Sequence, residues 1–542
     1  MFFNDTEIFR TSTAEPTRTG ITWTYVKDMS NFLILFREPQ KIIFDLGNLV
    51  DDTYTGLWNT TLTATFFTAQ EVVEPADLIL PVSTHRSVDN APSAFVVPKV
   101  RAVNSLSLPR NIKKAVFTIS ACGQASEEFW WSNVLTSDIR AFGNETTLYG
   151  HSAFRELRLL IDGNLAGVAW PFPVVFTGGI VPGFWRPVVG IDAFDLREDE
   201  IDISPFLPRL TDGNEHSFEI QVLGIDDNGQ GIAMFTTAIE SNWVVTGKIF
   251  LWLDHNANTI SGGLPSISAP EPTVSLQSVR NSSGNGTTKS LDYSIEVVRN
   301  LHIESTLHTL DGPKTVSWTQ HLTFSNSGNL GNQGNDQKVQ QRTSIRNTSP
   351  FTSYVRSADY PLEVESSYNA PVGGNLTIAA TMSRAKNVRQ SSDLAFPNEW
   401  KTFDLSRLPA NLKIIPGFTG SNVQNQQSGT ASYLSIPAQK VSYSAGKTEQ
   451  LYVLSGQSDS PTTVVQSGLN AVTGSATRQA KEELYRRHIL AENDTIVYDD
   501  ETFGKQLDAQ HRPTTFRPPI NAGSMHEFAG HGIRALLGRG PQ

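Results

Sequence analysis

The chain has 542 residues, of which 39% are hydrophobic and 18% charged, and its formal net charge at pH 7 is -11. This length exceeds one ordinary hydrophobic core, so we expect about two or three domains. The acidic balance and the lack of a basic cluster argue against nucleic acid as a partner, because binding to phosphates depends on clustered Lys and Arg. No stretch of the sequence has the length and apolarity of a transmembrane helix.

Residues 1–98 are predicted to form strands and turns. Residues 42–46 are a short apolar run typical of a strand. Residues 59–67 alternate between apolar side chains and threonines, which predicts a half-buried strand. Pro92 and Pro98 indicate a connection to the next domain.

Residues 99–262 contain the densest strand signals. Apolar runs at residues 114–119 and 248–253 predict strands, and residues 218–222 alternate between apolar and polar positions. Two further apolar runs flank Asp162-Gly163-Asn164, which is a hairpin signal. Short strands at this spacing indicate an antiparallel sandwich or jelly roll.

The remainder of the chain predicts a linker, a third β-rich part and an extension. Residues 263–290 are rich in Pro, Ser and Gly and are expected to form the linker. Residues 291–460 are expected to form a β-rich domain, in which residues 326–335 form a long hairpin loop. In the extension, residues 461–542, the stripe of Ala480, Leu484 and His488 predicts a helix over residues 478–489, and the rest is expected to be loops.

The stretch Ser126–Asn133 combines two adjacent carboxylates with three consecutive aromatic residues. If it is a strand, Glu128 and Trp130 lie on one face and Glu127 lies on the other with two rings. A carboxylate beside an indole suits a carbohydrate site, because the ring stacks on a sugar while the acid handles a proton. The alternative is a core strand with glutamates near its end.

Residues 168–187 form an unusual block of aromatic residues, prolines and paired glycines. Trp185 beside Arg186 is a candidate sugar-facing wall, because guanidinium groups donate to hydroxyls and carbonyls. Trp170 is a further candidate for substrate binding. A structured aromatic loop that fills the mouth of a sandwich is the alternative interpretation.

Other catalytic motifs are weak or lacking. The histidines of His526–His531 are five residues apart, whereas a zinc peptidase helix needs them four apart. No Gly-x-Ser-x-Gly elbow or dinucleotide fingerprint occurs. Cys122 ends an apolar run, and we expect a buried, inert thiol rather than a nucleophile.

Glycosylation acceptor sequences favour passage through a secretory compartment. Their Ser or Thr lies two residues after an asparagine, without an intervening proline. Residues 1–7 do not resemble a signal peptide, so we expect that the N-terminus is incomplete. The acceptor asparagines are Asn4, Asn59, Asn144, Asn281, Asn285, Asn347, Asn375 and Asn493.

Several of these segments are also family signatures. They are residues 10–17, 45–48, 54–56, 127–130, 162–163, 169–173, 178–183, 185–187, 190–196 and 243–248. On these segments the chain resembles the peptide N-acetyl-β-D-glucosaminyl asparaginase amidase A family. The resemblance implies hydrolysis of the amide between a glycosylated asparagine and its first N-acetylglucosamine, with N-glycosylated peptides as partners and no metal or organic cofactor.

The resemblance also implies tandem jelly-roll domains with a cleft between them, followed by a further β-rich region, so the expected fold class is all-β. It points to Glu128 as the catalytic acid, with Glu127 in reserve and Trp130 beside it. The aromatic-Asp-Arg motif expected just before Arg10 does not occur in this chain. We therefore expect an incomplete first jelly roll over residues 1–98 and impaired activity.

Three functions are compatible with these features. The resemblance favours an N-glycan amidase. The missing Asp-Arg keeps open a glycan-binding jelly-roll protein without turnover, and a structural cell-surface β protein is the third possibility.

Overall fold

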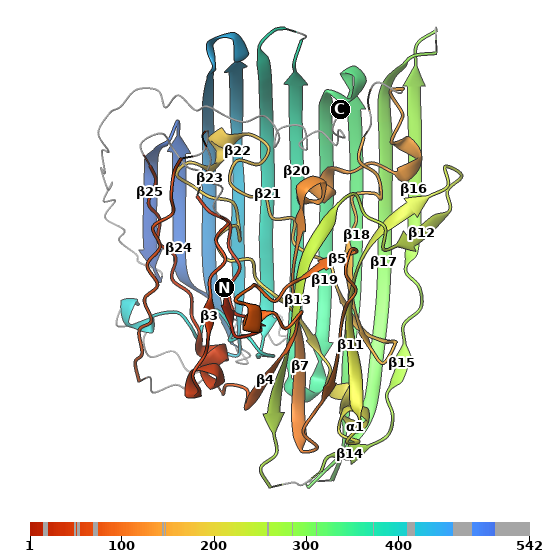
Figure 1. The fold of residues 1–542 in the computed structure, drawn as a ribbon, viewed down its shortest axis with the longest axis vertical. Coiled ribbons are helices and arrows are strands. Elements are labelled where there is room, and N and C mark those ends of the chain that lie inside the picture. Colours follow the sequence, from red (N-terminus) through yellow and green to blue (C-terminus); the bar gives the residue numbers. More distant parts are fainter. Residues whose placement is uncertain are drawn as a thin grey trace, which may run out of the picture.

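The structure is a computed structural model, and it describes residues 1–504 with gaps. Residues outside the description are 15–19, 48–49, 51, 53–54, 69–73, 144–145, 147, 257–258, 285, 311, 372, 409–417, 459–479 and 505–542. The predicted all-β class is confirmed, because the described chain is built from antiparallel sheets with short helical turns. Figure 1 shows long strands side by side in one broad sheet that lies along the shorter strands.

Two five-stranded sheets form a sandwich. The first has the order β10 (Asp199–Asp202), β7 (Ile112–Gln124), β13 (Asn242–Leu253) and β4 (Leu78–Val82), with β5 (Phe95–Val97) also paired to β13. The second has the order β12 (Ala233–Thr236), β11 (Glu215–Asp227), β8 (Glu156–Ile161) and β9 (Asn164–Ala169), with β6 (Ala102–Ser107) also paired to β11.

The core of the sandwich is filled by side chains that alternate inward along the strands. Phe117 of β7 stacks on Phe218 of β11 with ring centroids 6.2 Å apart. The predicted hairpin is confirmed: β8 and β9 are joined by Asp162 and Gly163, whose φ angles of 49° and 77° suit a tight turn.

A 12-stranded sheet follows in the described chain and packs against the sandwich. It contains β14 (Ser261–Gly262), β15 (Ser266–Ser268), β16 (Thr273–Ser282), β17 (Thr288–Thr309), β18 (Gly312–Gly331), β19 (Asp336–Ser349), β20 (Tyr354–Asn369), β21 (Leu376–Ser391), β22 (Gly420–Ile436), β23 (Val441–Ser458), β24 (Ala480–Glu492) and β25 (Thr495–Phe503). From β17 to β25 each strand pairs with the next one in sequence, and burial along β17 alternates residue by residue, so one face of this sheet lies on the protein core.

The sheet and sandwich share a second hydrophobic cluster. Phe154 packs edge-on against Phe324 of β18, and Gln320 of β18 exchanges hydrogen bonds of 2.9 Å with the backbone N–H and C=O of Val168 in β9. These contacts fix the second sheet of the sandwich between the other two layers.

Small elements complete the fold. A three-stranded sheet contains β1 (Phe2–Phe3), β2 (Thr6–Glu7) and β3 (Ile42–Ile43), the last within the strand predicted at residues 42–46. Among the described residues, the α-helix is α1 (Leu207–Leu210), and none of the helices is long and apolar enough to cross a membrane. The 3-10 turns are η1 (Ser30–Arg37), η2 (Ser87–Asp89), η3 (Ala125–Ser132), η4 (Thr136–Asp138), η5 (Pro182–Trp185), η6 (Ser204–Phe206), η7 (Asn332–Gly334), η8 (Pro350–Thr352), η9 (Leu405–Arg407) and η10 (Pro437–Gln439).

The predicted domain boundaries need correction in the first half. Residues 1–98 do not form a separate jelly roll in the described structure, because β4 and β5 pair with β13 of the sandwich. Residues 59–67 are exposed and form no strand. The alternation of apolar residues and threonines is not enough to predict a strand, because a strand also needs a partner strand for its backbone hydrogen bonds.

Three predictions in the second half are wrong. The expected linker at residues 263–290 contains β15 and β16, which pair with β17. The expected loop at residues 326–335 is mostly the end of β18, and only the short η7 turn links it to β19. The expected helix at residues 478–489 is β24, paired with β23 and β25. Its stripe repeats every four residues, a spacing that fits one face of a strand as well as one face of a helix.

Candidate active site

A cavity of about 560 Å³ lies between the sandwich and the large sheet. The sandwich contributes β7, β10, η3 and the residues that follow β9, and the large sheet contributes residues of β18 to β23. Residues 25–28 and 396–402 close other sides of it. Three of the candidate residues from the sequence, Glu128, Trp130 and Trp170, line this cavity.

Glu128 reaches the cavity from a helical turn, so the strand considered for residues 126–133 does not form. The chain leaves β7, passes Ala125 at a φ of 54° and folds back as η3. A Cβ on Gly123 would lie 2.2 Å from the carbonyl oxygen of Glu127, so this close return requires glycine. The turn nevertheless brings Glu128 and Trp130 to the same cavity.

The Glu128 carboxyl group is half-buried and has no hydrogen-bond or ion-pair partner in the described part of the chain. Burial alone raises its pKa to about 7, because the charged form loses hydration without gaining a compensating partner. At neutral pH both the acid and the carboxylate are therefore populated. This is the protonation behaviour of a general acid or base.

Glu127, the reserve candidate, has the opposite environment. Its carboxylate is buried and forms a two-pronged ion pair with Arg155, with both N–O distances at 2.7 Å. It also accepts hydrogen bonds from Trp243 Nε1 at 2.7 Å and from the backbone N–H of Glu240 at 3.0 Å. Although burial opposes the charge, Arg155 and these donors hold the pKa of Glu127 below its usual value. Glu127 therefore anchors η3 and does not line the cavity.

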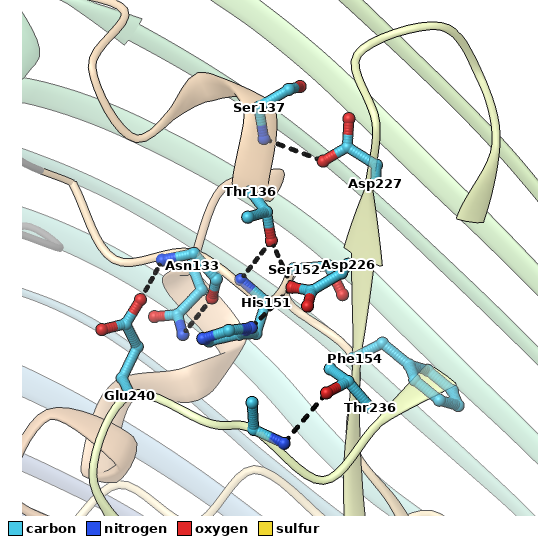
Figure 2. A network of polar contacts seen from close by, with 12 residues as sticks. Asn133, Thr136, Ser137, His151, Ser152, Phe154, Asp226, Asp227, Thr236 and Glu240 are labelled. Atoms are coloured by element: carbon cyan, nitrogen blue, oxygen red, sulfur yellow. Dashed lines mark hydrogen bonds and ion pairs between the residues drawn. The ribbon is translucent and has the colours of Figure 1, made fainter. Parts of the chain in front are cut away.

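A polar network that includes Glu240 and Asn133 (Figure 2) joins this anchor through the backbone N–H of Glu240. Glu240 continues the network by accepting the backbone N–H of Gly150, and Asn133 donates to the carbonyl of Gly150 at 2.9 Å. His151 Nδ1 lies 2.6 Å from Asp226. These contacts tie the end of η3 to β11 and to the residues between β12 and β13, which fixes the position of Glu128 in the cavity.

The aromatic candidates divide into two groups. Trp170 lines the cavity, while its indole N–H donates to Glu156 at 3.0 Å. Trp185 is buried outside the cavity lining, and its indole N–H donates to the carbonyl of Gly179 at 2.6 Å. Arg186 is also buried outside it, and its Nε lies 3.2 Å from Asp494.

The predicted sugar-facing wall of Trp185 and Arg186 is therefore not present in the described structure. These residues belong to η5 and its C-terminal end, which pack on β22 and β23. A Cβ on Gly183 would lie 2.5 Å from the carbonyl oxygen of Ala445, so η5 touches the sheet backbone directly. The alternative interpretation of an aromatic packing loop fits them.

Sequence reasoning missed a set of acidic residues that line the cavity. Asp192 pairs with Lys386, Asp195 with Lys27 and Tyr25, Glu198 with Lys248, and Glu399 with Arg197. The segment 190–196 carried a signal, since its two aspartates lie in a family-like motif. The partners come from distant parts of the chain, and no local pattern predicts them.

Two further carboxyl groups of the cavity, Asp199 and Glu200 on β10, form no ion pair with a residue that the structure describes. Burial raises the pKa of Asp199. Burial also raises the pKa of Glu200 to about 7, although its Oε1 accepts the backbone N–H groups of Ala395 at 2.7 Å and Phe396 at 2.9 Å.

Cys122 also lines the cavity and is half-buried, so the expectation of a fully buried thiol is wrong. Arg10 Nη1 lies 3.4 Å from its sulfur. The segment His526–His531 lies outside the described residues. No group of potential metal ligands is found among the described residues.

Comparisons with known proteins identify the family of the chain. The family model described as Peptide N-acetyl-beta-D-glucosaminyl asparaginase amidase A matches residues 1–270, and the model of the PNGase_A C-terminal domain matches residues 292–362. The chain belongs to the amidase A family. The chain is also 33% identical over 373 residues to the Peptide-N4-(N-acetyl-beta-glucosaminyl)asparagine amidase A of Prunus dulcis. The aligned stretch covers 65% of this chain and 61% of the relative. No solved structure matches the chain.

Both matched regions of the amidase A family contribute to the cavity. The first contains Glu128, Trp130 and the acidic residues 192–200, and the second contains Tyr354, Arg356 and Tyr360 of β20. The cavity is therefore built where the two family regions meet.

Proposed function

We propose that this protein hydrolyses the amide bond between an N-glycan and its asparagine in glycopeptides or glycoproteins. Support comes from membership of the amidase A family and from the name of the Prunus dulcis relative. The chain spans 61% of that relative, so the activity is a proposal for this chain rather than a transfer of the relative's name.

The reaction needs water, an acid and a base. Water adds to the carbonyl carbon of the asparagine side chain, the carbon–nitrogen bond breaks, and the nitrogen takes up a proton. The peptide keeps an aspartic acid, and the glycan leaves as a glycosylamine. A group that gives a proton to the departing nitrogen and takes one from water lowers both barriers.

One observation carries the assignment: the Glu128 carboxyl group lines the cavity beside Trp130 without a partner among the described residues, and burial raises its pKa to about 7. In the protonated form Glu128 donates to the leaving nitrogen. The ring of Trp130 offers an apolar surface beside the acid, which suits the C–H face of a sugar. The neighbouring Glu127 holds the turn in place through Arg155.

The test is an assay of purified full chain with an N-glycosylated peptide in water labelled with heavy oxygen. We expect a free glycan and a peptide whose glycosylated asparagine has become aspartate with one heavy oxygen. The variant Glu128→Gln should lower kcat by about 10²- to 10⁴-fold, the usual contribution of general acid–base catalysis. Glu365→Gln, at an exposed glutamate of β20 outside the cavity lining, serves as a matched control and should leave kcat unchanged. Glycan binding without product would establish the non-catalytic alternative instead.

We infer that the chain passes through a secretory lumen, because it carries many glycosylation acceptor sequences. The acceptor side chains of Asn59 and Asn375 are exposed, whereas Asn347 is 6% exposed and lines the cavity. Expression in a eukaryotic secretory host followed by peptide mapping should find glycans at exposed acceptors and none at Asn347. A glycan at Asn347 would contradict the structure.

A further inference from the structure

We propose that Asp199, Glu200, Tyr354 and Arg356 form a subsite that binds the hydroxyl groups of one neutral sugar of the N-glycan. The inference rests on the proposed function and extends it to the large sheet, to which it gives a role in substrate binding. All four residues line the cavity, two from β10 of the sandwich and two from β20 of the large sheet.

The distance between these two walls is set by a buried contact. Ser349, at the end of β19, donates from its hydroxyl to Asp202 Oδ2 at 2.6 Å, and Asp202 belongs to β10. Both side chains are buried. A pre-formed site of this kind loses little conformational entropy when a ligand binds.

Tyr354 gives the sharpest indication of a ligand. Its ring stacks on Trp318, with centroids 6.2 Å apart and an interplanar angle of 27°, so the hydroxyl group has a defined position. The hydroxyl is buried and has no hydrogen-bond partner in the described parts of the chain. A buried hydroxyl without a partner costs free energy, and a ligand that supplies the partner recovers it.

Glu200 is held in a way that leaves one oxygen for a ligand. Its Oε1 accepts both backbone N–H groups from Ala395 and Phe396, whereas its Oε2 takes part in no hydrogen bond with a described residue. Arg356 donates from Nη2 to Tyr360 Oη at 3.0 Å, which orients the guanidinium group. The subsite thus presents acceptors and donors side by side.

Charge decides which chemical class fits. Four other acids of the cavity wall, Asp192, Asp195, Glu198 and Glu399, already have cationic partners. The remaining carboxyl groups repel a phosphate or carboxylate, and Arg356 repels a cationic side chain. Sugar hydroxyls both donate and accept, so they match a mixed set of acceptors and donors. The rings of Tyr360 and Phe172, 5.2 Å apart, add apolar surface to the same wall.

The experiment measures binding separately from turnover. Affinity for an intact glycopeptide is determined by calorimetry in the Glu128→Gln background, with and without Tyr354→Phe. We expect Tyr354→Phe to weaken binding by about threefold to tenfold, the value of one hydrogen bond. The Tm of the Tyr354→Phe variant should stay equal or rise, because the Tyr354 hydroxyl makes no hydrogen bond with a described residue. Tyr443→Phe, on an exposed tyrosine of β23, is the matched control and should change neither quantity.

Each outcome is decisive. Unchanged affinity in both Tyr354→Phe and Glu200→Gln would overturn the subsite, and so would weakening that occurs only with peptides rich in Lys or Arg. A lower Tm with unchanged affinity would assign Tyr354 to the fold. If the wild-type chain shows no turnover but Tyr354→Phe still weakens glycopeptide binding, the hydrolase proposal fails and the subsite stands.

Discussion

Glu127 and Glu128 are neighbours in one helical turn, yet they differ in whether any partner compensates the charge of the carboxylate. Glu127 is buried against Arg155 and receives four charge-assisted or neutral hydrogen bonds from Arg155, Trp243 and Glu240. Glu128 meets no partner among the described residues and faces a cavity. The pKa of the first is lowered, and that of the second is raised to about 7.

Burial by itself therefore does not predict protonation. Both residues lose hydration, and the sign of the pKa change depends on whether the charged form is compensated. The comparison also separates two kinds of contribution to function. Glu127 stabilises the turn in its ionised form, and Glu128 keeps a proton available at neutral pH because nothing stabilises its charge.

The largest effect is expected when the partner of Glu127 is removed. Arg155→Met should lower the free energy of unfolding by about 3–5 kcal/mol, because it leaves a buried carboxylate uncompensated. Urea denaturation followed by circular dichroism measures this loss. Arg342→Met, which disrupts the exposed pair with Asp359, should cost less than about 1 kcal/mol. Equal effects in the two variants would show that the Glu127 pair does not anchor the turn.

A second prediction concerns Glu128 and pH. A pKa of about 7 in place of 4.5 means that the folded state holds its proton more tightly than the unfolded state. The contribution of Glu128 to stability is therefore full below pH 4.5 and is lost as pH rises through about 7. Glu128→Gln should remove this loss and stabilise the protein above pH 7 by at most roughly 3 kcal/mol, a figure that water in the cavity reduces.

Denaturation of wild type and Glu128→Gln across the pH range tests this. The difference in unfolding free energy should be constant below about pH 4.5 and should increase toward pH 8. Glu127→Gln should show the opposite sign, because its carboxylate is stabilised by partners. A difference for Glu128→Gln that stays constant over the whole range would contradict the raised pKa.

The smallest effect is expected at Trp185, whose indole N–H has a partner, in comparison with Trp130 in the cavity wall. Trp185→Phe removes an indole N–H that donates to the Gly179 carbonyl, so it should cost about 1 kcal/mol of stability and leave KM unchanged. Trp130→Ala removes ring surface from the cavity and should raise KM. Thermal denaturation and steady-state kinetics of both variants give the comparison. A raised KM in Trp185→Phe alone would return that residue to the substrate site.

The sequence predicts the parts of this molecule that are set by local pattern. The β8–β9 hairpin follows from Asp162-Gly163, and the strands β7, β11 and β13 follow from apolar runs and alternation. Local chemistry also singles out Glu128, which lines the cavity, since a carboxylate next to an indole is informative in either a strand or a turn.

The failures are long-range in origin. The turn η3 exists because Gly123 allows the chain to fold back, and the strand propensity of the aromatic residues does not show this. The stripe of Ala480, Leu484 and His488 fits both a strand and a helix, and pairing with β23 decides for the strand. The acid–cation pairs of the cavity join residues up to 202 positions apart, as for Arg197 and Glu399. A local sequence pattern does not predict pairs at such separations.

The position of β20 within the broad sheet has an evolutionary consequence. Three strands of the sequential run, β17, β18 and β19, precede it, and five, β21 to β25, follow it. Insertions, deletions or duplications of hairpins at either border of the sheet therefore leave this strand of the cavity wall in place. The borders of such a sheet can change in length while the residues of β20 that line the cavity keep their spacing.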